Sequence, residues 1–152
     1  MRDVLVAAAV VLALAALLVH RPASRATIRA SPVLTPGALN PNVTQANIHE
    51  TICVRGWTKT VRPPVEYTNA LKVEQMRKYC ETGDPSDYQE DHLISLELGG
   101  DPRDPRNLWP EPYPRAAKVD TIENELNSKV CSGELSLAEA QRKESALKHT
   151  DG

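Results

Sequence analysis

The sequence predicts an α+β fold in which a short β-hairpin is followed by a helix, with further helices on its flanks. Within residues 88–100, Ile94, Leu96 and Leu98 alternate with polar residues before a Gly-Gly pair, a pattern typical of a strand that enters a turn. Farther along, apolar side chains recur at spacings of three and four, as they do on an amphipathic helix: Val119, Ile122, Leu126 and Val130. With 152 residues and 41% hydrophobic content, the chain suffices for one domain with a modest core.

Extended segments are expected in three places. Residues 48–61 are rich in β-branched and aromatic side chains, which predicts one or two short strands with a turn at Gly56. Residues 88–100 predict a strand or an extended hairpin, and residues 101–106 have the Pro and Asp content of a turn. Residues 107–109 then resume as a short extended piece before a run of prolines.

Helices are expected in three further places. The first runs over residues 68–83 and is capped by its leading Thr. The second carries the apolar stripe described above and closes at Gly133. The third starts at Ser136, where Glu139 completes a capping box, and runs toward Lys148.

The amino terminus predicts export. Residues 4–19 form an uninterrupted run of 16 apolar residues, which fits the hydrophobic region of a signal peptide better than a full bilayer span. We therefore assign residues 1–26 to a signal peptide or an uncleaved anchor. The expected location is secreted or periplasmic, and the alternative is a domain anchored to the membrane by residues 4–19.

A linker is expected between this segment and the domain. Residues 27–46 carry three Pro and one Gly among small and polar residues without a sustained period, so we predict a flexible linker. The domain itself is then expected over residues 47–152.

The formal net charge argues against a general nucleic-acid binder. It is −2 for the whole chain, and removing the three basic and one acidic residues of the first 26 makes it −4. Contacts with a polyanion must then come from local basic clusters, for which two candidates stand out: Arg55, Lys59 and Arg62, or Arg103 and Arg106.

Three cysteines in an exported chain permit one disulfide and leave one thiol. We expect Cys53 to pair with Cys131, because this bridge would tie the first element of the domain to the last. Cys80 ends a predicted helix and is expected to be buried and inert. The absence of a C-x-x-C pair gives no zinc signature.

The residues that suggest chemistry are an adjacent acid and imidazole, Asp91 and His92. On an extended segment their side chains point to opposite sides, so one can hold a cation while the other addresses a different atom. A carboxylate suits a hard divalent ion, and an imidazole can take a proton from water. Asn107 and a helix with Asp120 and Glu123 follow.

Residues 90–100 read EDHLISLELGG, and residues 107–110 read NLWP. This order resembles the DHxxPLxxGG…NLxP motif of the HNH endonucleases, the ββα-metal nucleases, over about residues 88–125. The chain also resembles small exported bacterial proteins with a TICV…VRPP amino-terminal half, often classed as HNH-like. The resemblance implies a ββα-metal core and hydrolysis of phosphodiester bonds in nucleic acid.

The resemblance also assigns roles. It implies that His92 is the general base, that Asp91 holds a divalent metal and that Asn107 orients the loop of the histidine. The expected metal is Mg²⁺, with Mn²⁺ or Zn²⁺ as alternatives. The expected substrate is DNA rather than RNA, bound by a monomer with no membrane domain beyond an N-terminal anchor.

One part of the family motif is missing. The family places a second metal ligand, His or Asn, near the start of the following helix, whereas residues 113–118 read YPRAAK and contain neither. Glu111, Asp120 and Glu123 are the remaining candidate oxygen donors, and the last two lie three residues apart and share a helix face.

Phosphate contacts are expected from basic residues around the motif, through charge rather than base recognition: Arg103, Arg106, Arg115 and Lys118. A second hypothesis is a non-catalytic domain with an eroded metal site that acts as an envelope binding or structural module. Without the resemblance, Glu123 is expected on a solvated helix face, and Trp57 and Trp109 are expected in the core.

Overall fold

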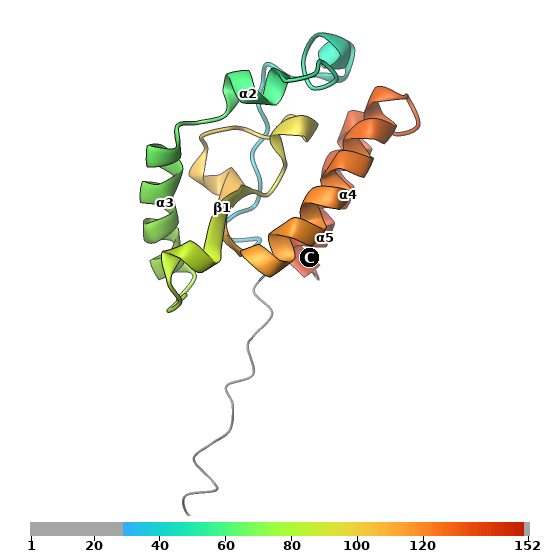
Figure 1. Ribbon diagram of the computed structural model, residues 1–152. Coiled ribbons are helices and arrows are strands. Elements are labelled where there is room, and N and C mark those ends of the chain that lie inside the picture. Colours follow the sequence, from blue (N-terminus) through green and yellow to red (C-terminus); the bar gives the residue numbers. More distant parts are fainter. Residues whose placement is uncertain (1–28, 151–152) are drawn as a thin grey trace, which may run out of the picture.

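A two-stranded antiparallel hairpin forms the centre of the fold (Figure 1). Its strands are β1 (Tyr88–His92) and β2 (Leu108–Pro112), and Asp91 pairs with Trp109 across the ladder. The structure is a computed structural model that describes residues 29–150, so the predicted signal segment lies outside the described residues. The hairpin and its helices confirm the α+β fold class.

Helices lie on both sides of the hairpin (Figure 1). On one side is α3 (Val65–Lys78), and on the other are α4 (Tyr113–Cys131) and α5 (Leu137–Thr150), which pack against each other. The shorter helical elements are η1 (Gln45–Glu50), α2 (Trp57–Val61), η2 (Pro85–Asp87), η3 (Leu96–Leu98) and η4 (Pro105–Asn107).

The three predicted long helices are confirmed. α3 begins directly after Pro64 and ends at Lys78, so the predicted cap at Thr68 and the predicted end at Gly83 are wrong. α4 has a proline in its first turn, where a backbone N–H is not needed. α5 is preceded by the predicted capping box. The backbone N–H of Ser136 donates to the Glu139 carboxylate at 3.1 Å, and the Glu139 N–H donates to the Ser136 hydroxyl at 3.3 Å.

The strands predicted over residues 48–61 are wrong, because this stretch forms η1 and α2 instead. Local hydrogen bonds explain the difference. The Thr44 N–H donates to the Asn47 side chain at 2.8 Å, which starts η1, and Gly56 adopts a left-handed φ of 86° before α2. β-Branched side chains favour strands only where a neighbouring strand is available to pair with them.

The extended segment predicted over residues 88–100 holds only for its first part, β1. After His92 the chain leaves the ladder, and the alternating Ile94, Leu96 and Leu98 are all buried around η3. The alternation therefore does not separate a buried face from an exposed one. The turn and the extended piece predicted after it are confirmed as η4 and β2.

Residues 29–46, expected to belong to a flexible linker, instead pack against the domain. Ala30 and Thr35 are buried, and the Thr35 hydroxyl donates to the Leu108 carbonyl at 3.3 Å. The Gly37 N–H donates to the Arg106 carbonyl at 2.9 Å, and Leu39 bridges Gly100. The small polar residues that suggested a linker serve here as hydrogen-bonding partners of the hairpin loop.

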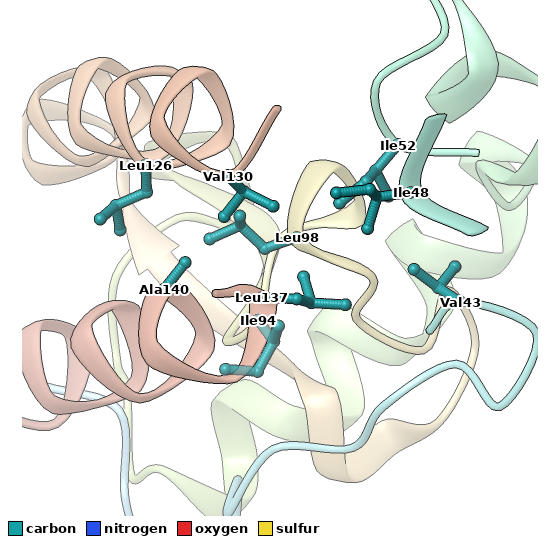
Figure 2. Packing of buried hydrophobic residues seen from close by; sticks show 9 residues of the cluster. All are labelled: Val43, Ile48, Ile52, Ile94, Leu98, Leu126, Val130, Leu137 and Ala140. Atoms are coloured by element: carbon teal, nitrogen blue, oxygen red, sulfur yellow. The ribbon is translucent and has the colours of Figure 1, made fainter. Parts of the chain in front are cut away.

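One cluster of aliphatic side chains forms the larger part of the core (Figure 2). It draws on η1, the hairpin loop, α4 and α5, and its members are Val43, Ile48, Ile52, Ile94, Leu98, Leu126, Val130, Leu137 and Ala140. A smaller cluster surrounds Trp109, which is fully buried as predicted, while Trp57 is partly buried against the larger cluster.

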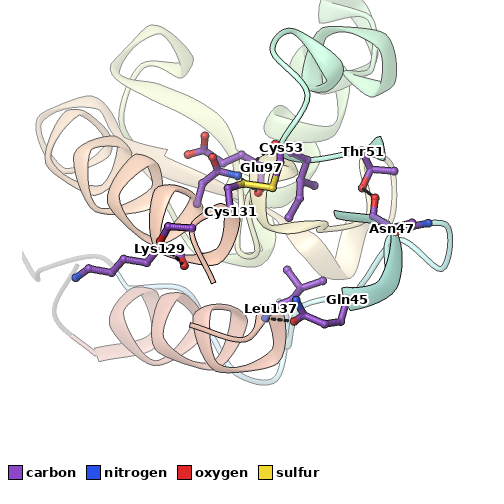
Figure 3. Close-up of a disulfide and its surroundings, with 11 residues drawn as sticks. Gln45, Asn47, Thr51, Cys53, Glu97, Lys129, Cys131 and Leu137 are labelled. Atoms are coloured by element: carbon purple, nitrogen blue, oxygen red, sulfur yellow. Dashed lines mark hydrogen bonds between the residues drawn. A yellow bond between two sulfur atoms is a disulfide. The ribbon is translucent and has the colours of Figure 1, made fainter. Parts of the chain in front are cut away.

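The disulfide between Cys53 and Cys131 is confirmed and joins the segment after η1 to the end of α4 (Figure 3). Disulfides persist in oxidising compartments, which supports a location outside the cytoplasm. The prediction that Cys80 is buried is wrong, since its side chain is exposed. Cys80 follows the end of α3 and has a left-handed φ of 56°.

Among residues 29–150, no helix has the length and apolar content needed to cross a membrane.

Replacing Cys53 and Cys131 together by Ala is expected to lower the free energy of unfolding by about 4 kcal/mol, because the bridge closes a long loop in the unfolded chain. The bridged residues are 78 apart in the sequence. Urea unfolding followed by circular dichroism measures the difference. Cys80→Ala is the matched control and should change stability by less than about 0.5 kcal/mol. An equal loss in both variants would contradict the prediction.

Candidate functional site

Asn107 holds the loop that follows the Asp-His pair. Its side-chain oxygen accepts from the Ile94 N–H at 3.0 Å, and its amide nitrogen donates to the carbonyls of Ile94 at 3.0 Å and Asp101 at 2.9 Å. Asn107 is fully buried and contacts the backbone two residues beyond His92 rather than the imidazole. It therefore fixes the loop that follows His92.

The Gly-Gly pair makes this arrangement sterically feasible. A Cβ atom on Gly100 would lie 1.8 Å from the Ile94 carbonyl oxygen and 2.7 Å from the Asn107 amide nitrogen. Gly99 has a φ of 75° and ends η3 in the left-handed conformation. The two glycines and Asn107 thus form one structural unit.

An open cavity of about 330 Å³ lies at the end of β1. Four of its lining residues, from β1 and α4, are predicted site residues: Asp91, His92, Asp120 and Glu123. The others are Thr58, Arg62, Gln89, Ser95, Leu96, Glu97 and Asn124. The structure thus gathers the proposed base and three of the four candidate metal ligands at one cavity.

His92 is arranged to accept a proton. Its Nε2 lies 3.1 Å from the Pro102 carbonyl oxygen, and since a carbonyl only accepts, the neutral ring carries its hydrogen there and its lone pair on Nδ1. Burial lowers the pKa of His92, and the neighbouring Asp91 carboxylate offsets only part of this effect. The imidazole is therefore neutral at pH 7, as a general base must be.

Asp91 is paired with a lysine from the last turn of α5. The Lys148 ammonium donates to Asp91 Oδ2 at 2.7 Å, and the other carboxylate oxygen accepts from the Gln89 side chain at 3.2 Å. Burial by itself would raise the pKa of Asp91, but the ammonium outweighs it and holds the pKa below its ordinary value. Asp91 is thus ionised, with one oxygen committed to Lys148.

Glu123 binds the same lysine, so the prediction that it lies on a solvated helix face is wrong. Its Oε1 accepts from the Lys148 ammonium at 2.5 Å, and the residue is only 8% exposed. Burial raises the pKa of Glu123 in spite of the ammonium. Burial also raises the pKa of Glu144, which lies 3.5 Å from the ammonium, to about 7.

The mouth of the cavity is electrostatically suited to a cation. Asp120 is exposed, and its pKa is raised by partial burial and then by the charge of Asp91. The pKa of Glu97 is likewise raised by burial and then by Asp120. Carboxylates that repel one another in this way attract positive charge. Residues 29–150 nevertheless contain no group of three or more His, Cys, Asp or Glu arranged to hold a metal ion.

Two of the predicted residues lie away from the cavity. Glu111 is fully buried in β2, with an oxygen 3.4 Å from the Arg115 guanidinium, and burial raises its pKa to about 8. Arg115 covers the ring of Trp109 at 4.9 Å and donates to the Lys148 carbonyl at 3.0 Å. Because its side chain is buried, we no longer expect Arg115 to contact substrate phosphates.

The other predicted basic residues are exposed. Arg103 lies over the ring of Tyr67 at 5.4 Å, and Arg106 pairs with Asp104 at 2.5 Å. Lys118 is exposed on α4. None of the three lines the cavity itself, whereas Arg62 does.

Sequence analysis missed Lys148 and Glu144 as site residues. The signal was present, because Leu137, Ala140, Glu144 and Lys148 follow one another at spacings of three and four and all four are buried. An apolar helix stripe that continues into charged side chains indicates a buried ionic contact. The partner of such a contact lies on another element, so spacing along the helix does not identify it.

Comparison of the chain with protein-family models, with curated proteins and with solved structures finds no match. The functional assignment therefore depends on the site geometry and on the resemblance described above.

Gly100→Ala is expected to cost about 3 kcal/mol or more of unfolding free energy, because the added Cβ overlaps the loop backbone. Gly133→Ala is the control. Gly133 has a φ of 82° but nothing within 4 Å of the added atom, so its cost should stay near about 1 kcal/mol. Urea unfolding compares the two, and equal losses would contradict the role given to Gly100.

A pH-dependent stability is expected from Glu90. Its two carboxylate oxygens are buried with no hydrogen-bond partner among residues 29–150, and burial raises its pKa from 4.5 to about 8. The folded protein therefore binds a proton that the unfolded chain releases above 4.5. This contribution to stability is full below that pH and is lost as the pH rises toward 8.

The glutamine of Glu90→Gln cannot ionise, so the stability of this variant relative to the wild type should increase between pH 5 and pH 8 by roughly 3 to 4 kcal/mol. Chemical unfolding at several pH values measures this. Glu125→Gln is the control, because the Glu125 side chain is 62% exposed on α4, where it pairs with Lys129. A Glu90→Gln difference that stays constant with pH would show that the carboxyl is not perturbed.

Proposed function

We propose that this protein is an exported, divalent-metal-dependent nuclease that hydrolyses phosphodiester bonds, preferably in DNA, with little sequence preference. One observation carries the proposal: a neutral imidazole and three acidic side chains, His92 with Asp91, Asp120 and Glu123, line the same open cavity. This is the set of groups that metal-assisted hydrolysis of a phosphodiester requires.

His92 is the proposed base. Its Nδ1 lone pair takes the proton of a water molecule that attacks the phosphorus, while the Pro102 carbonyl keeps the ring in one tautomer and orientation. Asn107 and Gly100 contribute by fixing the loop on which Pro102 and the following residues lie. The protein thus supplies the position and the protonation state of the base.

A divalent ion fits the cavity side of the acidic cluster. Asp91 has one oxygen that is not bonded to Lys148, and Asp120 is exposed at the same cavity, so these two carboxylates would hold the ion. Mg²⁺ commonly takes one or two carboxylates and retains several waters, so the missing His or Asn ligand does not prevent binding. The ion would stabilise negative charge on the phosphoryl and leaving oxygens.

Basic residues near the cavity support binding of the phosphate backbone. Arg62 lines the cavity. Arg103 directly follows Pro102, whose carbonyl contacts His92, and Lys118 is exposed on α4. These are charge contacts, which position a nucleic acid without distinguishing its bases. The formal net charge of −2 indicates that such binding depends on these local groups and weakens with salt.

The second candidate is a non-catalytic domain that keeps this framework as an envelope binding or structural module. The observation in its favour is that Asp91 and Glu123 each accept, with one carboxylate oxygen, a hydrogen bond from the Lys148 ammonium. In this case the acidic cluster would serve stability alone.

A plasmid-nicking assay with Mg²⁺ or Mn²⁺ tests the proposal. The wild-type protein is expected to nick supercoiled DNA and to cleave DNA faster than RNA. Cleavage should stop when EDTA removes the metal ion. His92→Ala should reduce the rate by about 100-fold or more, the usual contribution of a general base. His49→Ala is the matched control, since His49 is exposed in η1 and does not line the cavity, and it should retain full activity.

Two outcomes would reject the nuclease and favour the non-catalytic domain. One is the absence of metal-dependent cleavage by pure wild-type protein. The other is equal cleavage by the wild type and His92→Ala, which would point to a contaminating enzyme.

A further inference from the structure

The open cavity has two side walls that come from distant parts of the chain. One wall is α4, and the other is α2 with the residue that follows it, which contribute Thr58 and Arg62 to the lining. We call residues 54–62 the α2 wall. Among the lining residues the positive charge comes from Arg62, so this side chain is the one placed to bind a phosphate oxygen across the cavity from α4.

The disulfide joins these two walls. Cys53 directly precedes the α2 wall, and Cys131 is the last residue of α4 (Figure 3). Beside the bridge, the Asn127 side chain of α4 donates to the Ile52 carbonyl at 3.3 Å and to the Glu97 carbonyl at 2.7 Å. Glu97 itself lines the cavity. The separation of the two walls is thus set at one end of the cavity, by a covalent bond and a neighbouring hydrogen bond.

The α2 wall has few attachments of its own. Within residues 29–150, its hydrogen bonds all stay between residues 51 and 62, as when the Arg62 N–H donates to the Thr58 carbonyl at 3.0 Å. None of the residues of α2 is buried, and Trp57 packs against the larger core cluster while only partly buried. The disulfide therefore contributes much of what holds this wall in place.

The elements on both sides of the α2 wall are held independently of the disulfide. Before the wall, η1 and the residues after it bury Ile48 and Ile52 in the core. After the wall, α3 buries Leu71 and Met76. Breaking the bridge therefore leaves both ends of the α2 wall in place and loosens the segment between them.

We propose that the disulfide is a redox switch for substrate binding at the cavity, which acts through the α2 wall and Arg62. This inference rests on the proposed nuclease function. A dithiol transfers two electrons and two protons to the bridge, so that the S–S bond breaks, Cys53 and Cys131 become thiols and the dithiol becomes a disulfide. Both cysteines are half-buried, so a reductant reaches them.

Such a switch fits an exported nuclease. Cytoplasmic thiol systems keep cysteines reduced, whereas a bridge forms and persists outside the cytoplasm. The chain therefore binds nucleic acid weakly before export and more tightly after it, which protects the nucleic acid of the producing cell.

Hydrolysis of a fluorogenic DNA oligonucleotide with Mg²⁺, with and without dithiothreitol, tests the switch. Reduction is expected to raise KM about tenfold and to change kcat by less than about twofold, because it removes one charge-assisted contact to the phosphate backbone. Replacing Cys53 and Cys131 together by Ala should give the same KM as reduction and no response to dithiothreitol. Cys80→Ala is the matched control and should respond as the wild type does.

Arg62→Ala identifies the path of the effect. This variant should have a KM about tenfold higher in the oxidised state, and reduction should raise it by less than about twofold more, because the contact that reduction removes is already absent. If the bridge acted on the cavity without Arg62, the two effects would multiply.

Hydrogen exchange of the wild-type protein, followed by mass spectrometry, measures the loosening without any nuclease activity. Reduction is expected to speed the exchange of amides in the α2 wall by about tenfold or more, while those of β1 and of Asn107 keep their protection.

Four outcomes would overturn the switch. They are unchanged exchange in the α2 wall, unfolding of the entire domain on reduction, an unchanged KM in the reduced protein, and multiplied effects of reduction and Arg62→Ala. A wild type that cleaves nothing in its oxidised form rejects the proposed function instead, and the exchange measurement then still decides whether the bridge holds the α2 wall.

Discussion

The buried ion pair between Lys148 and Asp91 is the interaction on which the arrangement of the site depends. It joins the last turn of α5 to the end of β1, and through Glu123 it also reaches the middle of α4. A buried ammonium without its partners would be strongly destabilising, so these three elements must come together as a unit. The same contact keeps Asp91 ionised although its side chain is buried.

The core explains why such polar contacts matter in this chain. Its larger cluster consists of aliphatic side chains contributed by short elements and loops, and the chain contains no Phe. A small apolar core leaves little margin for the entropy of ordering long connections. Three specific interactions each fix one such connection without apolar burial: the hydrogen bonds of Asn107, the disulfide and the ion pair between Lys148 and Asp91.

Sequence reasoning succeeded where the signal is local. The helix period of Val119 to Val130 and the capping box at Ser136 depend on residues three and four apart, and both are confirmed in α4 and α5. It failed at residues 48–61, where β-branched side chains had no strand to pair with. The Asp-His pair and Asn107 were proposed as site residues from their motif. Lys148 is 57 residues from Asp91 and was not proposed, because pairing across the fold leaves no mark in the spacing.

The pattern of cysteines has a consequence for the maturation of the chain. Cys80 is exposed and lies between the two bridged cysteines, so during synthesis the thiols of Cys53 and Cys80 are both present before Cys131. A bridge between Cys53 and Cys80 would close a shorter loop than the native one, at a lower entropic cost. From such a bridge the native pairing is reached when the thiolate of Cys131 attacks the sulfur of Cys53 and releases the thiolate of Cys80, a thiol–disulfide exchange.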